Sequence, residues 1–492
     1  MEPDQLMTRY MGTETEYGIS TPSDPTLSPI LTSTHAVVAY NAAMRWNYEA
    51  EEPLADARGF NLRRYKQAPT FDPDAIGIAN VIVANGGRFY VDHAHPEYSS
   101  PECSNAWDAM VYDQAGDLVL LSAARRIAER FEAEESVLRG QAPCPPLKLY
   151  KNNVDGKGAS YGSHENYQYS RHTDFDAVVA GLIPFFVARQ VVIGAGRVGI
   201  GEEGEFAGFQ ISQRADYFVQ EVSLETTLNR GIINTRDEPH ADPNEFRRLH
   251  TIIGDANMSQ TSNLLKLGLT KLVLDAIERG TRFDDLRLAD PVRALKTTSR
   301  DPSLKVTVPL ADGRKLTALD ILATYRERLE PLDDVDAKVL EIFDDVAADL
   351  ACDPLSTADR LDWVAKYALM QRYGLPWDDP KLRLIDLQYA DIDPAKSIYH
   401  ALVRKNAMRT LVEPEVISAA AKNPPADSRA YFRGRVCAEF HPDSASWQTI
   451  AFGNRRMQLG AVDKWTKADT EAMLDAATSV DELLAEYDRV NT

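Results

Sequence analysis

The segment from residue 88 to residue 98 constrains the fold of this chain more than any other, because it combines strand-forming residues with charged side chains at alternating positions. Its aromatic and β-branched residues, 89–91, favour an extended backbone. Alternate side chains of a strand share one face, so Arg88, Tyr90 and Asp92 are predicted to lie together. A sheet face that carries a guanidinium, a phenol and a carboxylate is typical of a site for a metal and a phosphate, and is not typical of a core.

The end of this segment carries a proline, a glutamate and two histidines. Pro96 cannot donate a hydrogen bond to a sheet, so the strand is predicted to end there, with Glu97 curling back just beyond it. His93 and His95 are odd-numbered, and alternation therefore places them on the face opposite to Asp92. We expect these two histidines to support the fold or the surroundings of a metal rather than to bind the metal.

Three further segments carry functional side chains two positions apart, and each has the pattern of a strand. The pairs are Glu14 and Glu16, His164 and Asn166, and Arg248 and His250. Four strands of this kind can together build one polar cavity on a curved sheet. Carboxylates and imidazoles suit Mg²⁺ or Mn²⁺, which commonly bridge protein carboxylates to substrate phosphates. Arginine binds phosphate through two parallel hydrogen bonds. The residues therefore predict a divalent-metal nucleotide site on a β-sheet.

The order of the predicted elements favours one fold class. Strand patterns cluster in the N-terminal half and helical periodicity dominates later, which suits an α+β fold better than alternating βαβ units. The predicted helices span residues 106–138, 174–192 and 259–279, with more between 316 and 371. Residues 423–427 contain two prolines and resemble a linker. We therefore expect a catalytic domain over residues 1–425 and a small C-terminal domain over residues 426–492.

A glycine-rich segment imitates a known cofactor motif. Residues 194–199 match the GxGxxG pattern of dinucleotide sites. That motif requires a helix to begin on the glycines, whereas residues 201–204, Gly-Glu-Glu-Gly, would break a helix here. We predict a glycine-rich turn between a helix and a strand and no dinucleotide site of this type.

Charge and cysteine content exclude several classes of protein. The formal net charge of −20 argues against a general nucleic-acid-binding protein, since phosphate backbones require clusters of Lys and Arg. The cysteines have no CxxC spacing, so neither a zinc ribbon nor a disulfide framework is expected, and reduced thiols in a cytosol explain them simply. They are Cys103, Cys144, Cys352 and Cys437.

The chain shows no sign of a membrane segment in its sequence. It opens on an acidic stretch without the basic and apolar regions of a signal peptide. The longest apolar run, residues 177–188, contains Pro184 and is shorter than the ~20 residues that a membrane span needs. We expect a soluble, cytoplasmic protein that does not bind membranes. The oligomeric state stays open.

Four segments together resemble one known family, the ligases and deamidases of the prokaryotic ubiquitin-like protein Pup. The segments are Met11–Ser20, Arg88–Cys103, Tyr150–Tyr167 and Ile233–Asn257, and they follow one another in the family's order. These enzymes are similar to glutamine synthetase and the carboxylate-amine ligases. The resemblance implies a glutamine-synthetase-like catalytic domain, with a curved, mainly antiparallel sheet packed by helices, and a small C-terminal domain.

Within the family, two features resemble the deamidase branch rather than the ligase branch. Here two residues, His93 and Ala94, separate Asp92 from the His-Pro-Glu of residues 95–97. The ligases have one more residue before their His-Pro-Glu. The insert from about Arg45 to Ala79 resembles a mobile loop of the deamidases that ligases lack. This implies an enzyme that uses ATP and Mg²⁺ to convert the C-terminal Gln of Pup to Glu and to hydrolyse the Pup–lysine isopeptide bond of pupylated proteins. The alternatives are a Pup–protein ligase and, from another class, an inactive adaptor that binds Pup.

The resemblance also implies roles for single residues. Asp92 matches the catalytic aspartate, which acts as nucleophile or general base; whether it or a phosphate attacks first stays open. The positions that match the metal site are Glu14, Tyr90, Glu97, His164 and His250, with Glu16 as an addition from the same strand. The positions that match the surroundings of the nucleotide are Arg88, Ser99, Ser100, Asn166 and Arg248. Trp447 either stacks on the nucleotide base or is a core aromatic residue.

Overall fold

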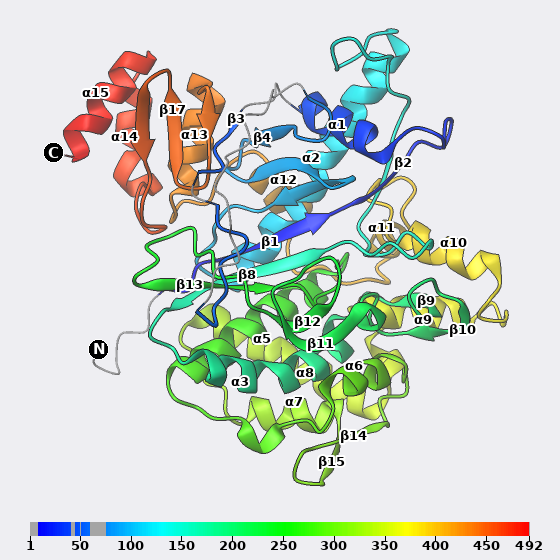
Figure 1. Ribbon diagram of the computed structural model, residues 1–492. Helices are drawn as coiled ribbons and strands as arrows, with labels where there is room; N and C mark the ends of the chain where they lie inside the picture. Colours follow the sequence, from blue (N-terminus) through cyan, green and yellow to red (C-terminus); the bar gives the residue numbers. More distant parts are fainter. Residues whose placement is uncertain (1–7, 41–44, 50, 60–74, 492) are drawn as a thin grey trace.

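The computed structural model describes residues 8–40, 45–49, 51–59 and 75–491 (Figure 1). A six-stranded sheet has the order β13-β8-β1-β6-β5-β4, and every neighbouring pair in it is antiparallel. Its strands are β1 (Met11–Glu16), β4 (Asn80–Ile82), β5 (Arg88–Asp92), β6 (His95–Ser99), β8 (Ser163–Ser170) and β13 (Phe246–Thr251). With strands concentrated early in the chain and helices later, the expected α+β fold with an antiparallel sheet is confirmed.

Two long helices cover the apolar face of this sheet. They are α2 (Ala106–Glu132) and α5 (Gln260–Glu278), which pack on each other and on β1 and β8. The Asn105 side chain accepts a hydrogen bond from the backbone at the start of α2, and Ser259 does the same for α5. Helix α5 is buried on all sides, including polar residues such as Lys266. The helix predicted over 259–279 is thereby confirmed.

Helix α2 ends at Glu132, earlier than the predicted end at residue 138. Two further acidic residues follow, and negative charge at the C-terminal end of a helix opposes the helix dipole. Glu134 takes a left-handed φ of 57° there, which stops the helix. The helix predicted over 174–192 is divided at Arg189 into α3 (Phe175–Ala188) and the single turn α4 (Gln190–Ile193).

The remaining elements surround this core. The other strands are β2 (Gly18–Ser20), β3 (Arg45–Trp46), β7 (Lys148–Tyr150), β9 (Arg197–Ile200), β10 (Phe206–Gln210), β11 (Phe218–Ser223), β12 (Arg230–Asn234), β14 (Thr307–Pro309), β15 (Lys315–Thr317), β16 (Ser444–Ala445), β17 (Thr449–Phe452) and β18 (Arg455–Gln458). The other helices are α1 (Pro29–Tyr40), α6 (Pro291–Ser299), α7 (Ala318–Arg326), α8 (Asp334–Cys352), α9 (Asp362–Gln371), α10 (Pro380–Tyr389), α11 (Ile398–Arg404), α12 (Pro414–Ala420), α13 (Ala430–Phe440), α14 (Lys467–Ala476) and α15 (Val480–Asn491). In the GxGxxG segment, residues 194–196 connect α4 to β9 and residues 197–199 already belong to β9, so no helix begins on the glycines.

The C-terminal elements form a separate small sheet with helices, seen in orange and red in Figure 1. Its strand order is β18-β17-β16-β3, so its last strand comes from the beginning of the predicted insert. Strand β3 pairs in parallel with β16, and Trp46 packs into the same apolar cluster as α13. The domain division at residues 425 and 426 stays a prediction. The expected mobility of the insert falls largely on residues 60–74, which lie outside the described residues.

The prediction that the strand ends at Pro96, with Glu97 curling back beyond it, was wrong. Strand β5 ends at Asp92, the two-residue turn of His93 and Ala94 reverses the chain, and Pro96 lies within β6 opposite Val91. The Val91 N–H donates across to β4, so this pair exchanges no hydrogen bonds and the missing proline donor costs nothing there.

No helix among the described residues is long and apolar enough to cross a membrane. The four cysteines are free, and only Cys352 is exposed. Neither observation conflicts with the expectations from the sequence.

Candidate active site

The antiparallel register brings the predicted strand residues to one side of the six-stranded sheet, called the site face here. Directly opposite residues of an antiparallel pair point to the same side, and the register pairs Glu14 with both Ser99 and His164. The residues of the site face are Glu14, Glu16, Arg88, Tyr90, Asp92, His95, Glu97, Ser99, His164, Asn166, Arg248 and His250. Along β8 the residues of this face are half-buried and those of the other face are fully buried. The predicted sharing of one face is therefore correct for Arg88, Tyr90 and Asp92 and for the pairs of the other three segments.

Three residues of the site face can bind a metal ion. Glu14, His164 and His250 offer ligand atoms that all lie within 4.8 Å of one another. The Nδ1–H of His250 donates to Oδ1 of Asn166 (3.0 Å), which leaves the lone pair of Nε2 for a ligand. Nε2 is buried and has no hydrogen-bond partner among the described residues, which is costly unless a cation binds there. The donor set fits a divalent metal.

The protonation states of these groups agree with metal binding. Burial alone would raise the pKa of Glu14, but the hydrogen bond from His164 and the charge of Arg248 hold it well below its usual value. Burial, followed by the charges of Arg236 and Arg248, keeps the pKa of His250 well below its usual value. A carboxylate and a neutral imidazole are the forms that bind metals.

Further carboxylates lie next to this group. Glu97 is buried, and burial followed by the charges of Asp92, Glu16 and Glu14 raises its pKa well above the usual value. Such repulsion among neighbouring carboxylates is relieved when a cation binds between them. Across the β5–β6 ladder, Tyr90 pairs with Glu97, so all six residues predicted for the metal site lie on the site face.

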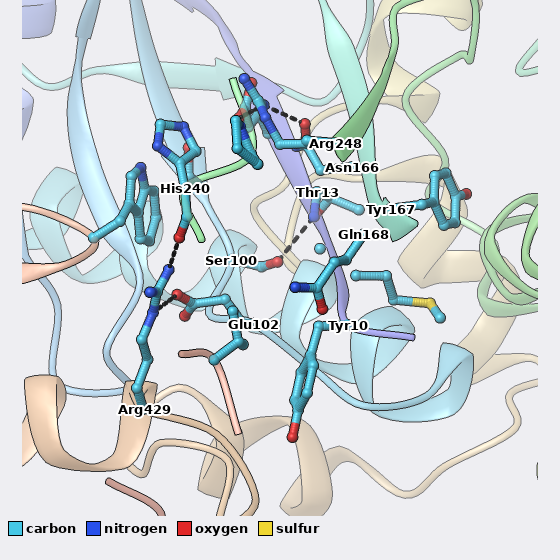
Figure 2. Close-up of a pocket in the computed structure, with 17 residues that line it drawn as sticks. Tyr10, Thr13, Ser100, Glu102, Asn166, Tyr167, Gln168, His240, Arg248 and Arg429 are labelled. Carbon is cyan, nitrogen blue, oxygen red and sulfur yellow. Dashed lines mark hydrogen bonds and ion pairs between the residues drawn. The ribbon is translucent and has the colours of Figure 1, made fainter. Parts of the chain in front are cut away.

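A pocket opens beside these carboxylates, between the sheet and the C-terminal elements (Figure 2). The space within it is about 580 Å³ when the open space at its mouth is included. Its lining includes Glu14, Ser99, Ser100, Asn166, His240, Arg248 and Trp447. Five of the six residues predicted near the nucleotide therefore line one pocket.

Arg88 is the sixth, and it does not line this pocket. Its guanidinium lies between the rings of Trp46 and Tyr90, 3.7 Å and 3.9 Å from their centroids, and its Nε donates to Asn80 (2.8 Å). It remains on the site face, adjacent to Ser99 in the register. The stacking holds its charge close to the pocket.

Trp447 is a packed aromatic residue that also borders the pocket, and its stacking on a nucleotide base stays a prediction. It is half-buried, packs edge-on against Trp46 at 5.6 Å and lies under the guanidinium of Arg433 at 4.8 Å. It also forms part of the pocket wall together with His240, whose ring is 6.4 Å away. It is a packed aromatic residue with one surface toward the pocket.

An ion-pair cluster that forms part of this wall was missed from the sequence. Glu102 accepts from Nε of Arg429 (2.9 Å) and pairs with Arg433, and both arginines are almost fully buried. Arg429 also donates to the backbone oxygen of His240 (2.6 Å), and Arg433 donates to that of Trp447 (3.1 Å). The only sequence signal was two arginines four positions apart in an otherwise apolar segment.

Cationic groups at the other end of the site were also missed. Arg214 is 1% exposed, and its Nη1 donates to the backbone oxygen of Tyr161 (2.8 Å). Burial and the neighbouring charge of Arg230 lower its pKa to about 10. Among the described residues, its Nε has no hydrogen-bond partner. A buried cation with so few acceptors is suited to an anionic ligand.

His95 lies on the site face, contrary to the expectation from alternation. The two-residue turn after Asp92 changes the parity, so that His95 pairs directly with Asp92. Its Nδ1 is 3.2 Å from a Glu16 oxygen, and its ring stacks on Tyr161 at 4.2 Å. His93, by contrast, lies in the turn itself, where its Nδ1 is 2.9 Å from Oδ2 of Asp92.

Comparison with known proteins gives consistent matches over nearly the whole chain. A family model described as Pup-ligase protein matches residues 9–451. A Pup deamidase/depupylase of Mycolicibacterium smegmatis is 51% identical over 97% of this chain and 99% of its own length. The solved complex between Pup and its ligase PafA has a TM-score of 0.77 at 30% identity, covering 98% of this chain and 92% of that one. The ligase PafA in complex with ADP has a TM-score of 0.72, also at 30% identity, covering 88% of this chain and 97% of that one.

Proposed function

This chain belongs to the family of Pup-ligase proteins, and from that membership we propose that it is a Pup deamidase and depupylase. It hydrolyses the side-chain amide of the C-terminal Gln of Pup to give Glu, and it hydrolyses the isopeptide bond between Pup and a lysine of a pupylated protein. One observation carries this assignment. The chain is 51% identical to a Pup deamidase/depupylase over 97% of its length, whereas a Pup–protein ligase of Geodermatophilus obscurus is 41% identical over 72% of it.

One site can serve both reactions, because both bonds are γ-carboxamides of the same Pup residue. Asp92 is proposed as the catalytic group. Burial alone would raise its pKa, but the hydrogen bond and charge of His93 and the charge of His164 lower it, so the carboxylate is ionised at neutral pH. An ionised carboxylate can attack the carbonyl carbon or remove a proton from a water molecule there.

The pocket beside the site face is proposed to bind ATP. Arg248 and the hydroxyls of Ser99 and Ser100 face phosphate and ribose oxygens, while Trp447 provides an aromatic surface for the base. The ligase PafA, with the same fold, forms a complex with ADP. Arg214, with its unpaired Nε, is placed to bind an anion at the opposite end.

Mg²⁺ is proposed as the metal, since a nucleotide site rich in carboxylates suits it. Glu14, His164 and His250 would hold it, with Glu16, Tyr90 and Glu97 beside them. When bound, the ion would neutralise the charge of phosphates and carboxylates and so strengthen the polarisation of the scissile carbonyl. The protein's own part is to hold Glu14 ionised and His250 neutral.

Mass spectrometry of Pup ending in Gln, incubated with the protein, ATP and Mg²⁺, tests the proposal. Deamidation adds about one mass unit to Pup, and a pupylated protein in the same mixture should lose Pup. If Pup ending in Glu is instead attached to lysines with formation of ADP, the protein is a ligase. If no reaction occurs but Pup binds, the protein is an adaptor.

A further inference from the structure

The β5–β6 hairpin runs from the buried end of the site to its open end. At the buried end, Arg88 and Ser99 face each other and are 8% and 3% exposed. At the turn, the side chain of Asp92 is 37% exposed and that of His93 is 71% exposed. A lysine on the surface of a folded protein can approach the site only from its open end. The leaving amine of a pupylated protein must therefore depart on the side of His93.

His93 is held in an unusual position by the turn. Its φ of 52° is in the left-handed region, which few residues other than glycine and asparagine adopt readily. This conformation turns the imidazole toward Asp92, where Nδ1 lies 2.9 Å from the carboxylate. Nε2 of His93 has no hydrogen-bond partner among the described residues, and the side chain is exposed.

Hydrolysis of an amide requires a proton for the departing nitrogen. An alkylamine is a very poor leaving group as its anion, so an acid must protonate it as the C–N bond breaks. Asp92 is ionised in the resting site and therefore brings no proton of its own to this step. We propose that His93 is a catalytic residue that donates a proton to the leaving amine.

The proposed step is balanced in protons and electrons. Water adds directly to the γ-carbonyl carbon of Pup and gives a proton to Asp92. The C–N bond then breaks, its electron pair stays on the lysine nitrogen, and His93 gives that nitrogen a proton. Transfer of the proton from Asp92 to His93 across their hydrogen bond restores both groups. The products are Pup ending in Glu and a free lysine. This inference rests on the proposed hydrolytic function.

The charges around His93 support this role. The hydrogen bond and charge of Asp92, with a smaller contribution from Glu16 on β1, raise the pKa of His93 to about 9. The other titratable groups around Asp92 are Glu14, His164, Glu97, Tyr90 and His95. His93 is therefore protonated at neutral pH, as an acid must be, and it loses its proton only in alkaline solution.

The test compares two leaving groups. One substrate is Pup joined through its terminal γ-carboxyl to a lysine of a protein, and the other is Pup joined there to the arylamine 7-amino-4-methylcoumarin. The anion of this electron-poor arylamine is a much better leaving group than that of an alkylamine, so its departure depends less on protonation. The variant His93→Asn keeps the left-handed turn and a hydrogen-bond donor beside Asp92 but has no proton to give. His441→Asn is the matched control, because His441 is also exposed and left-handed (φ 50°) but lies at the end of α13.

His93→Asn should lower kcat for the lysine substrate by about 10²- to 10⁴-fold and change that for the arylamide less than about threefold. The alkaline loss of wild-type activity on the lysine substrate should be absent from the variant's pH profile. Equal effects on both substrates, or none on either, would overturn the role of His93. If the wild-type protein cleaves neither substrate, the hydrolytic function itself is wrong. His441→Asn should match the wild type throughout.

Discussion

Glu102 offers the strongest single test of how the C-terminal elements are held against the nucleotide pocket. Burial opposes its ionisation, but Arg433 and Arg429 lower its pKa to about 2 from a usual value of 4.5. A shift of this size corresponds to about 3 kcal/mol of folding stability at neutral pH. Replacement by Gln removes this contribution and leaves two buried arginines without their carboxylate. We therefore expect Glu102→Gln to lower the free energy of unfolding by about 3 kcal/mol at pH 7.

The sign of the pH dependence follows from the direction of the shift. The pKa of Glu102 is lower in the folded state, so its contribution is complete above pH 4.5 and disappears as the pH falls toward 2. At pH 3 less than half of the difference between the wild type and Glu102→Gln should remain. Urea unfolding followed by tryptophan fluorescence measures it, since Trp46, Trp447 and Trp465 belong to the same apolar cluster.

The matched control is Glu439→Gln, which removes an exposed carboxylate that pairs with Arg435 one helical turn away. Such a surface pair contributes about 0–1 kcal/mol. A loss in Glu102→Gln no larger than in this control would refute the reasoning. So would a loss that stays constant between pH 7 and pH 3, because it would show that ionisation of Glu102 is not its source.

Three further substitutions test the proposed roles of single residues. Asp92→Asn should abolish turnover and leave calorimetric binding of Mg²⁺-ATP largely intact; normal cleavage by this variant would remove Asp92 from catalysis. Glu14→Ala and His250→Ala should each weaken Mg²⁺-ATP binding by about tenfold or more, and unchanged titration curves would exclude them from the metal site. Trp447→Ala should raise the KM for ATP while Trp447→Phe preserves it, because only an aromatic ring can stack on the base; equal KM values would show that Trp447 serves packing alone.

The sequence was sufficient to predict which side chains share the site face, because that property is local. In a strand, alternation alone assigns Glu14 and Glu16 to one side and the residues between them to the other. The structure explains the buried side of β1 as well. Thr13 and Thr15 both donate hydrogen bonds to Asp113 of α2, and these bonds fix the rotation of the strand. Alternation does not give the register between strands. The sequence therefore predicted a metal site from the types of residue present, but could not predict that Glu14, His164 and His250 lie close together.

The features that the sequence did not reveal all join residues distant in the chain. Glu102 and Arg433 are more than three hundred positions apart, and no periodicity connects them. Trp46 was part of an insert expected to be mobile, yet it forms a sheet with the C-terminal elements and contacts Arg88. Contacts of this kind depend on how whole elements pack, which local propensities do not determine.

The hairpin at Asp92 shows why a single local rule can reverse a functional conclusion. The proline rule predicted one strand that ended at Pro96, and parity then excluded His95 from the site. A proline is tolerated inside a sheet where its nitrogen faces a position without a ladder hydrogen bond, as it does opposite Val91. Once the chain turns at His93, the second strand presents its odd-numbered residues to the site face, and the same turn places an imidazole beside the catalytic carboxylate. The chemistry proposed for the open end of the site is thus a direct consequence of the length of this turn.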